Sequence, residues 1–321
     1  MMNDLPKKVA VLGASGHIGK NVTEFLREDP EYQLYLFVRS RGKMVDYLRN
    51  NGSFPRSNLK VLPFEDFRNG LYDVVINCVG IGNPNELTLE PYRIFQVTEE
   101  FDNLVLDYIR KHPKTLYINF SSGAIYGTDF AEAASQTKCA SIDVNQLGIK
   151  DYYGISKLHM EAKHRSLPDH YIVDIRIFGF FSRYIDMGSR FFLTDVVNSL
   201  NDNKALMTNS QDMVRDYVHP SDLKELMELC IHKHSINAAY DAYSLEPVTK
   251  FELLDYFISE HNLHVQYRHD EPSQSQSVTG AKNNYYSINK SAAEIGYTPN
   301  YSSMQCIADV VNLLKTGKSN A

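Results

Sequence analysis

A tyrosine and a lysine four residues apart, Tyr153 and Lys157, have the types and spacing to move a proton together. Positions i and i+4 share one face of an α-helix, and residues 151–165 have helical periodicity. A neighbouring ammonium favours the phenolate and would lower the tyrosine pKa from about 10 toward the range of a general acid or base. In a chain with 21 tyrosines this pair alone is a weak indication, because such pairs usually lie on solvated helix surfaces. Tyr152 is the weaker candidate, since its i+4 neighbour is Ser156.

Three glycines, Gly13, Gly16 and Gly19, stand between an apolar segment and a helical one. Glycines at a strand-to-helix turn let the backbone approach a pyrophosphate, which then lies on the N-terminus of the helix. The spacing predicts a dinucleotide site that also includes Ser15, His17 and Ile18, although glycine-rich turns also serve plain helix packing.

The end of the next apolar segment indicates which dinucleotide is bound. NAD-binding proteins usually carry an acid there for the ribose 2′-hydroxyl, whereas arginine suits the 2′-phosphate of NADP. Here the sequence is Val38-Arg39-Ser40-Arg41, with no acid. We therefore expect NADP, with Arg39 as the main phosphate ligand, Ser15 or Arg41 as helpers, and NAD as the alternative. The competing interpretation is that both arginines are solvated surface residues.

Short apolar segments alternate with helical ones through the first half of the chain. Strands are expected at residues 7–12, 33–38, 59–62, 73–78, 115–120 and 171–178, and helices at 20–27, 91–110 and 151–165. This alternation predicts an α/β fold, a Rossmann-type doubly wound parallel sheet with helices on both faces.

After residue 178 the pattern changes. We expect a dinucleotide-binding domain of residues 1–178 plus 215–243, and a smaller, mostly C-terminal α/β substrate lobe of residues 179–214 plus 244–321. The S/T-x-x-E spacing at Thr249 and at Ser291 predicts that each begins a helix with a capping box. Residues 271–287 are polar and are expected to form an exposed loop.

Composition excludes several classes of function. The chain has 321 residues, 33 basic and 39 acidic, and its net charge of −6 is not gathered in long runs, so nucleic-acid binding is not expected. No apolar run is long enough for a membrane span, and the polar residues 1–8 offer no signal-peptide core. The four cysteines are far apart with no C-x-x-C, which predicts free thiols in a reducing cytoplasm.

The eleven histidines raise the question of a metal site. His159 and His164 fall on an expected helix, and His232 and His234 lie near the end of another. No H-E-x-x-H motif or clustered acid accompanies them, so no metal is expected and solvated helix faces are the predicted positions.

Upstream of Tyr153, the sequence Asn119-Phe-Ser-Ser-Gly-Ala-Ile-Tyr-Gly127 lies where an expected parallel strand ends, a common ligand-binding position in open α/β sheets. The glycine turn, Ser-Ser-x-x-x-Tyr-Gly, Tyr-x-x-x-Lys and the Arg-Asp-Tyr-Val-His-Pro-Ser-Asp-Leu sequence of residues 215–223 follow in order. Together they resemble an extended short-chain dehydrogenase/reductase of the NAD-dependent epimerase/dehydratase (nucleotide-sugar) family. The resemblance covers residues 7–235 by motif and the rest by layout.

The resemblance implies roles for the matching residues. Ser122 would hydrogen-bond the substrate oxygen, Tyr153 would exchange its proton, and Lys157 would hold the nicotinamide ribose and lower the Tyr153 pKa. Val79 and Gly80 would touch the cofactor through their backbone.

Three further positions are implied less directly. Asp66 loosely matches an acid on the adenine side, with a solvated loop residue as the equal alternative. Arg215 resembles the arginine that binds the diphosphate of a nucleotide sugar, which suits bidentate recognition of phosphate. Gly123 would lie beside the substrate.

The chain also departs from the family pattern. Dehydratases carry an Asp-Glu pair where this chain has Gly123 and Ala124, which disfavours dehydration. Gly179 replaces an asparagine expected after the sixth strand, and a second phosphate-binding arginine has no clear counterpart.

We therefore expect an NADP-dependent oxidoreductase that reduces a keto group, at C4 of a nucleotide-linked 4-keto-6-deoxy sugar, with tyrosine as the acid. The alternatives are a nucleotide-sugar epimerase that retains NAD(P) and a non-catalytic NADP-binding protein. The resemblance also implies a homodimer, formed through the helices near residues 91–110 and 151–165.

Overall fold

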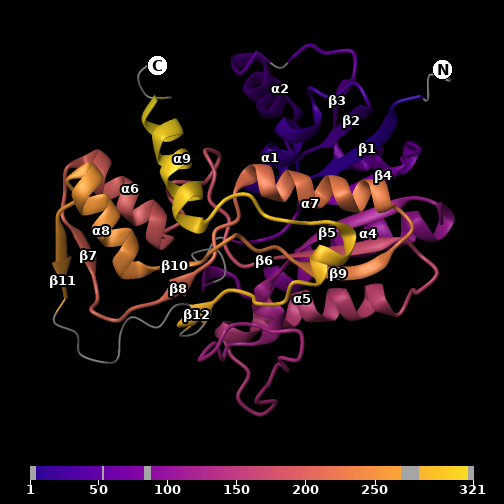
Figure 1. Cartoon of the computed structure of the whole chain (residues 1–321). Helices are drawn as coiled ribbons and strands as arrows, with labels where there is room; N and C mark the ends of the chain where they lie inside the picture. The colour runs from indigo at the N-terminus through magenta and orange to yellow at the C-terminus, as the bar shows by residue number, and fades with distance from the viewer. Residues whose placement is uncertain (1–4, 53, 83–87, 269–281, 317–321) are drawn as a thin grey trace.

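A seven-stranded parallel sheet dominates the computed structural model, which describes residues 5–52, 54–82, 88–268 and 282–316 (Figure 1). Its strand order is β3-β2-β1-β4-β5-β6-β9. The strands are β1 (Lys7–Leu12), β2 (Tyr32–Phe37), β3 (Leu59–Leu62), β4 (Val74–Asn77), β5 (Leu116–Ser122), β6 (Ile172–Ile177) and β9 (Asn237–Asp241). The order reverses between β1 and β4, and the crevice at such a reversal is where open α/β sheets bind ligands. The predicted doubly wound fold is confirmed.

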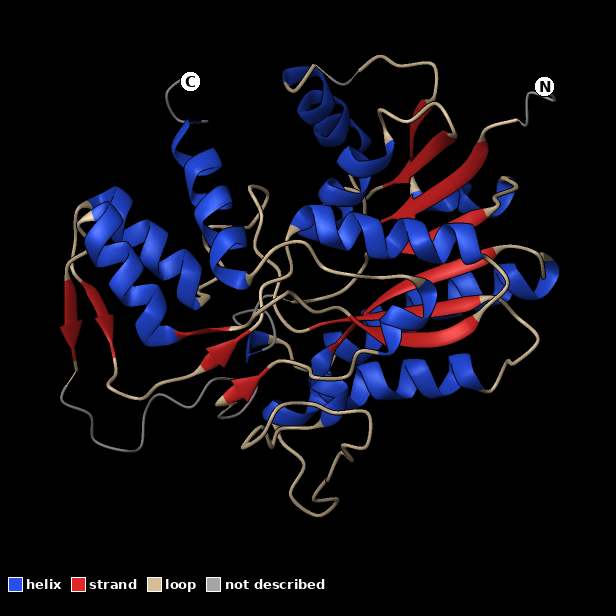
Figure 2. Ribbon diagram, viewed as in Figure 1, coloured by secondary structure: helices blue, strands red, loops and turns tan. Residues whose placement is uncertain are grey.

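Helices cover both faces of this sheet (Figure 2). One face packs against α1 (His17–Leu26), α2 (Arg41–Asn50) and α7 (Pro220–Lys233), and the other against α4 (Arg93–Lys111) and α5 (Ile149–Arg165). Strand β1 shows the alternation that this requires: Val9 and Val11 belong to the first core, and Ala10 and Leu12 to the second. The run of residues 9–12 in β1 is therefore apolar without interruption, because both of its faces are buried.

A smaller group of elements has its own core and lies to the left of the sheet in Figure 1. It contains α6 (Phe192–Asp202), β7 (Leu206–Thr208), β8 (Val214–Arg215), β10 (Val248–Thr249), α8 (Lys250–His261), β11 (Val265–Tyr267) and α9 (Ser303–Thr316). The capping box at the start of α8 is confirmed, because Thr249 and Glu252 exchange hydrogen bonds. The prediction of a second capping box, at Ser291, is wrong. Residues Ser291–Ile295 form only a 3-10 turn, η3, after which Gly296 turns the chain at φ 93°.

The C-terminal part of the chain returns from this smaller lobe to the large sheet. Strand β12 (Asn284–Tyr285) pairs in parallel with β8, and Ala134 forms a bridge with Ser287. Further along, Ala292 and Tyr297 are buried in the core of the large sheet. Of the exposed loop predicted at 271–287, residues 271–281 lie outside the described residues. For residues 282–287 the prediction is wrong, because Asn284–Tyr285 form a strand and Lys282 and Ser287 are buried. This return path brings β12 to the end of β5.

Two further predictions concern the cysteines and the absence of a membrane span. All four cysteines are free thiols, as expected. Within the described ranges, no helix combines the length and the apolar character needed to cross a bilayer.

Candidate functional site

The glycine turn joins β1 to α1 and lies against the end of β4. Gly13 adopts φ 74°, and a Cβ on it would come 3.0 Å from the backbone nitrogen of Val79. A Cβ on Gly19 would lie 2.2 Å from the carbonyl oxygen of Gly13. Both positions require glycine, because a side chain would push the turn away from the helix and from β4. Gly16 is exposed and is the N-cap of α1.

The N-terminus of α1 is suited to an anion. Among the described residues no side chain caps it, and its first turn holds no acid, so no carboxylate there offsets the positive end of the helix dipole. His17 is held there by a 2.8 Å hydrogen bond between its Nε2 and Ser182 Oγ. Burial, with Lys20 nearby, lowers the pKa of His17 to about 4, so the ring is neutral at pH 7. These residues fit a pyrophosphate, and Ser182 could not be predicted because it is 165 residues from His17.

The segment after β2 carries the arginines expected to select NADP. Val38 is buried, whereas Arg39 and Arg41 are exposed, as is Ser15 in the glycine turn. Ser40 is the N-cap of α2. The exposed arginines remain consistent with a 2′-phosphate ligand and with a solvated surface. Asp66 is partly buried in η1 (Phe64–Asn69), directly after β3.

Lys157 is buried at the junction of β4, β5 and α5. Its Nζ donates to the carbonyl oxygen of Phe120 at 3.0 Å and lies 5.9 Å from the centre of the Tyr153 ring. A Cβ placed on Gly80 would lie 3.9 Å from the same Nζ. The ammonium therefore stands between the end of β4 and the predicted acid, where a ribose would reach it.

Two glycines, Gly154 and Gly123, allow the close packing that brings the predicted residues together. A Cβ on Gly154 would lie 2.6 Å from the carbonyl oxygen of Ala124, so α5 can approach the turn after β5 only with glycine there. A Cβ on Gly123 would lie 2.4 Å from two ring carbons of Phe178. The close approach of α5 places Tyr153 beside the turn that carries Ser122.

Ser122 ends β5 and makes contact with a residue from the far end of the chain. Its Oγ lies 3.1 Å from the hydroxyl of Tyr285 and accepts a hydrogen bond from the Ala124 N–H at 3.2 Å. The ring of Tyr285 packs against Phe130 and Phe178, with ring centres 4.8 and 5.2 Å apart. Burial raises the pKa of Tyr285, so its hydroxyl stays protonated.

Two cations lie near the Tyr285 ring. Lys282 Nζ is 4.3 Å and Arg215 Cζ 6.0 Å from the ring centre. Arg215 Nη1 donates to the carbonyl oxygens of Val214 and Lys282 at 2.8 and 2.6 Å. Burial, with Arg215 nearby, lowers the pKa of Lys282 to about 8. Within the described ranges neither cation pairs with a carboxylate, so both are available to an anionic ligand.

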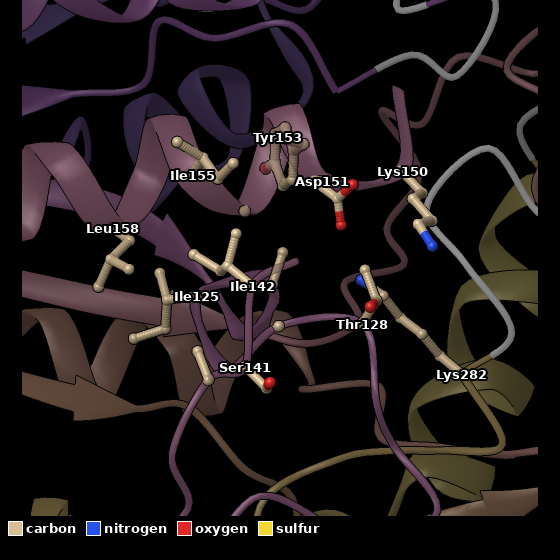
Figure 3. Close-up of a pocket in the computed structure, with 14 residues that line it drawn as sticks. Ile125, Thr128, Ser141, Ile142, Lys150, Asp151, Tyr153, Ile155, Leu158 and Lys282 are labelled. Atoms are coloured by element: carbon tan, nitrogen blue, oxygen red, sulfur yellow. The ribbon is translucent and has the colours of Figure 1, made fainter. Parts of the chain in front are cut away.

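A hollow beside these groups opens next to the predicted acid (Figure 3). Tyr153 projects into this region from α5, and Lys282 reaches it from the C-terminal segment, with its ammonium toward Thr128. The remaining lining residues are Ala124, Ile125, Gly127, Ala140, Ser141, Ile142, Lys150, Asp151, Gly154, Ile155 and Leu158. The hollow thus joins the predicted acid to a cation that pairs with no carboxylate in the described part of the chain.

The other motif tyrosine, Tyr126, has structural partners instead. Its hydroxyl donates to the buried carboxylate of Asp241 at 3.0 Å and accepts from Arg176 Nη1 at 2.9 Å. Burial, followed by Asp241, raises its pKa to about 12. Ser121 likewise donates to Glu161 at 2.5 Å. Among the described residues, the Ser-Ser-x-x-x-Tyr-Gly motif therefore leaves one hydroxyl, Ser122, without a carboxylate partner and uses the other two to hold the strand end.

His164 corrects the histidine prediction. It is fully buried between α4 and α5, and its two ring nitrogens bond Asp102 and Asp174 at 2.7 and 2.9 Å. The prediction of a solvated position for His164 is wrong, because the two carboxylates give its buried ring nitrogens the hydrogen-bond partners they need. His159, on the same helix, is exposed as predicted.

The sequence model of the NAD dependent epimerase/dehydratase family matches residues 9–245. The chain belongs to this family. This is a family of enzymes, and the chain carries the glycine turn, Ser122, Tyr153 and Lys157 predicted from its motifs. The individual roles of these residues stay predictions.

Solved structures share the fold of this family member. They include a UDP-N-acetylglucosamine 4-epimerase from Methanobrevibacter ruminantium M1 in complex with UDP-N-acetylmuramic acid, at TM-score 0.79 and 16% identity, covering 98% of this chain and 100% of that one. A UDP-glucuronic acid 4-epimerase from Bacillus cereus in complex with UDP-glucuronic acid and NAD has TM-score 0.76 and 17% identity, covering 96% and 99%. A dTDP-glucose 4,6-dehydratase from Bacillus anthracis str. Ames in complex with NAD has TM-score 0.76 and 14% identity, covering 98% of each chain.

The departures of this family member from the family pattern have steric reasons. The ring of Phe178 occupies the space that a side chain at Gly123 would need, so the first acid of the dehydratase pair does not fit. A Cβ on Gly179 would lie 2.5 Å from the carbonyl oxygen of Asp216, which excludes the asparagine at that position.

Proposed function

We propose that this protein is an NADP-dependent oxidoreductase that reduces a keto group, at C4 of a nucleotide-linked 4-keto-6-deoxy sugar. The observation that carries the proposal is the grouping of Ser122, Tyr153 and Lys157 at the ends of β4 and β5. This group lies next to a helix N-terminus without a cap and next to two cations without a carboxylate. Reduction of an anionic keto sugar needs hydroxyls at the keto oxygen, a lysine beside the proton donor and cations for the anionic part of the substrate. This group would supply all three.

The cofactor would lie along the carboxyl ends of β1, β2 and β4. The glycine turn and the N-terminus of α1 would hold its pyrophosphate, Lys157 the nicotinamide ribose, and Val79 and Gly80 the surface beside the ring. Arg39, with Ser15 or Arg41, would bind a 2′-phosphate. When bound, the nicotinamide supplies a hydride.

The protein's own groups would handle the substrate oxygen. Ser122 would donate a hydrogen bond to the carbonyl, and Tyr153 would give its proton to the oxygen as the carbon receives two electrons with the hydride. The Lys157 ammonium would stabilise the tyrosinate that remains. The product is an alcohol, and the tyrosine recovers its proton from solvent.

Arg215 and Lys282 would recognise the diphosphate of the substrate. Both are largely buried, and the guanidinium already bonds the carbonyl oxygen of Lys282, so the two cations stay close together. Lys282 is a candidate for the second phosphate ligand that the sequence analysis did not find. The ring of Phe178 at Gly123 supports reduction over dehydration, because it leaves no room for the first acid of the pair.

A second candidate is a nucleotide-sugar epimerase that oxidises and reduces the same carbon with a retained dinucleotide. Two of the structures that share this fold are 4-epimerases, and one of them holds NAD, which favours this reading. The intact Tyr153 and Lys157 argue against a protein that only binds NADP.

The homodimer also remains a proposal. Helices α4 and α5 pack side by side on one face of the sheet, and Leu158 of α5 is 37% exposed. Sedimentation velocity at micromolar protein is expected to show a dimer, and a monomer would contradict this assignment.

The test of the function combines cofactor binding and turnover. We expect the purified protein to bind NADPH more tightly than NADH and to oxidise NADPH when given dTDP- or UDP-linked 4-keto-6-deoxyhexose. Equal binding of the two cofactors would remove the main support for a reductase. Tightly bound NAD in the purified protein, with interconversion of two nucleotide sugars and no net oxidation, would establish the epimerase instead.

A further inference from the structure

Among the described residues, the hydroxyl of Tyr285 contacts Ser122 and has no part in the function proposed above. Tyr285 belongs to the two-residue strand β12, 163 residues along the chain from Ser122. Its position is fixed by the pairing of β12 with β8 and by a 2.9 Å bond from the Asn284 N–H to the carbonyl oxygen of Phe130. The ring is further held between Phe130 and Phe178. Strand pairing and ring packing therefore hold the Tyr285 hydroxyl next to Ser122.

The hydrogen-bond capacity of Ser122 limits what it can do for a substrate. A serine hydroxyl has one proton to donate and two lone pairs that accept. The Ala124 N–H already donates to Ser122 Oγ at 3.2 Å, and the Tyr285 hydroxyl lies 3.1 Å away. If Tyr285 donates, both lone pairs are used and the serine proton is left for a third partner.

The surroundings of Tyr285 favour this direction of the bond. Burial keeps the phenol protonated, so that it has a proton to donate to Ser122. The Lys282 ammonium, 4.3 Å from the ring centre, favours negative charge on the phenol oxygen and so strengthens its O–H as a donor. A carbonyl oxygen can only accept, so a bound keto group takes the Ser122 proton.

We propose that Tyr285 is a positioning residue that donates to Ser122 Oγ and thereby commits the Ser122 proton to the substrate oxygen. Hydrogen bonds in such a chain polarise one another, so the serine becomes a stronger donor as negative charge develops on the substrate. Tyr285 does not touch the substrate in this arrangement and transfers no proton to it. The proposal rests on the proposed function, because it takes Ser122 as the group that binds the keto oxygen.

Four full-length variants test this role: Tyr285→Phe, Ser122→Ala, the double variant, and Tyr286→Phe as the matched control. Tyr286 is the next residue, and its backbone bonds Ala134 as β12 ends. Each is assayed with NADPH and dTDP- or UDP-linked 4-keto-6-deoxyhexose, and thermal unfolding shows whether the fold is kept.

For Tyr285→Phe we expect kcat to fall about tenfold with KM changed less than about twofold, the size expected for loss of one hydrogen bond that matters in the transition state. In the Ser122→Ala background the same change should have no further effect, because the two residues act as one unit. Tyr286→Phe should match the unmodified protein.

Three outcomes would overturn the proposal. An unchanged kcat for Tyr285→Phe would show that Ser122 needs no second hydroxyl. A tenfold loss that persists in the Ser122→Ala background would show that Tyr285 acts on something else. If the unmodified protein reduces neither keto sugar, the proposed function fails, and the role of Tyr285 fails with it; activity of the unmodified protein separates the two failures.

Discussion

The two ends of helix α5 hold two buried polar clusters of opposite character. Toward its C-terminus, His164, Asp102 and Asp174 form what we term the closed cluster, completed by Lys163 and Arg165. Toward its N-terminus, Tyr153 and Lys157 lie near a group made of Ser122, Tyr285, Arg215 and Lys282, and we term all six residues the open cluster. The same helix thus supports one set of charges that is paired and one that is not.

In the closed cluster each charge faces an opposite one. Lys163 Nζ lies 2.5 Å from Asp102 and Arg165 Nη2 lies 3.0 Å from Asp174, while His164 bridges the two aspartates. Burial lowers the pKa of His164, but the two carboxylates more than offset this and raise it to about 9. The histidine is therefore a cation that holds α5 to α4 and to β6.

In the open cluster the cations bond only neutral groups among the residues that the structure describes. Lys157 and Arg215 donate to backbone carbonyls, and Lys282 lies against an aromatic ring. Burying a charge without an opposite one costs free energy, which a bound anion would offset. The difference indicates that the closed cluster stabilises the fold and that the open cluster is arranged for ligands.

The largest effect is expected for Tyr153→Phe in the open cluster. Removal of the acid should lower kcat about a thousandfold, within the usual range for a general acid, and leave NADPH binding unchanged. Turnover is followed by NADPH absorbance on the keto sugar. Tyr152→Phe is the matched control, because its ring packs against Phe95 and its hydroxyl is not assigned to the chemistry. Full turnover by Tyr153→Phe would disprove the catalytic assignment.

His164→Gln should be the most destabilising change in the closed cluster. It leaves two buried aspartates without their shared cation, and breaking a buried ion pair in this way costs about 3–5 kcal/mol of unfolding free energy. Urea denaturation measures the loss. His159→Gln on the exposed face of α5 is the control and should cost little. A His164→Gln protein as stable as its parent would show that the closed cluster does not hold the fold.

The closed cluster also predicts how stability depends on pH. Because the folded-state pKa of His164 is raised from 6.5 to about 9, its contribution is fully present below about pH 6.5 and is lost as pH rises through about 9. The unfolding free energy should fall by about 1–3 kcal/mol across that window. His164→Gln should lack this part of the pH dependence. Equal slopes in the two proteins would contradict the assignment.

Lys282→Met should separate the two clusters, because it removes a cation that has no acidic partner. We expect the Kd for UDP, used as the probe, to rise about tenfold, the value of one charge-assisted contact. The unfolding free energy should stay the same or rise slightly, opposite to His164→Gln. Lys150→Met, an exposed lysine of the same hollow, is the control. A large loss of stability in Lys282→Met would place this lysine with the structural charges.

Arg39→Gln carries the smallest expected effect and concerns the cofactor alone. Loss of the phosphate ligand should raise the Kd for NADPH about five- to tenfold and leave the Kd for NADH unchanged. Fluorescence titration with both cofactors measures the change, and Arg41→Gln shows whether the second arginine contributes. Equal weakening of both cofactors would assign Arg39 to general attraction rather than to the 2′-phosphate.

Features within one short segment could be predicted from the sequence. The glycine turn depends on spacing over seven residues, and the Tyr153–Lys157 pair depends on one helical turn, so both follow from local geometry. The alternation of strands and helices predicted the doubly wound sheet because its central strands, β1 and β4, each carry an apolar run that is buried on both faces.

Features that join distant segments could not be predicted. Tyr285 lies on a strand of two residues, too short for a periodic pattern, and it reaches Ser122 only because the chain returns from the smaller lobe. His164 looked like any helix histidine because its partners, Asp102 and Asp174, are 62 and 10 residues away. Ser182 reaches His17 across 165 residues for the same reason. Side-chain partners of this kind are set by tertiary packing.

Transfer of deuterium tests the central claim, that the open cluster reduces a keto carbon, most directly. The protein is given NADPH carrying deuterium at the nicotinamide C4, on each face in turn, with dTDP- or UDP-linked 4-keto-6-deoxyhexose. We expect deuterium from one face at C4 of the sugar in the product, one atom for each NADPH oxidised, and almost none with Tyr153→Phe. Product without deuterium from either face, or no oxidation of NADPH with either sugar, would contradict the account.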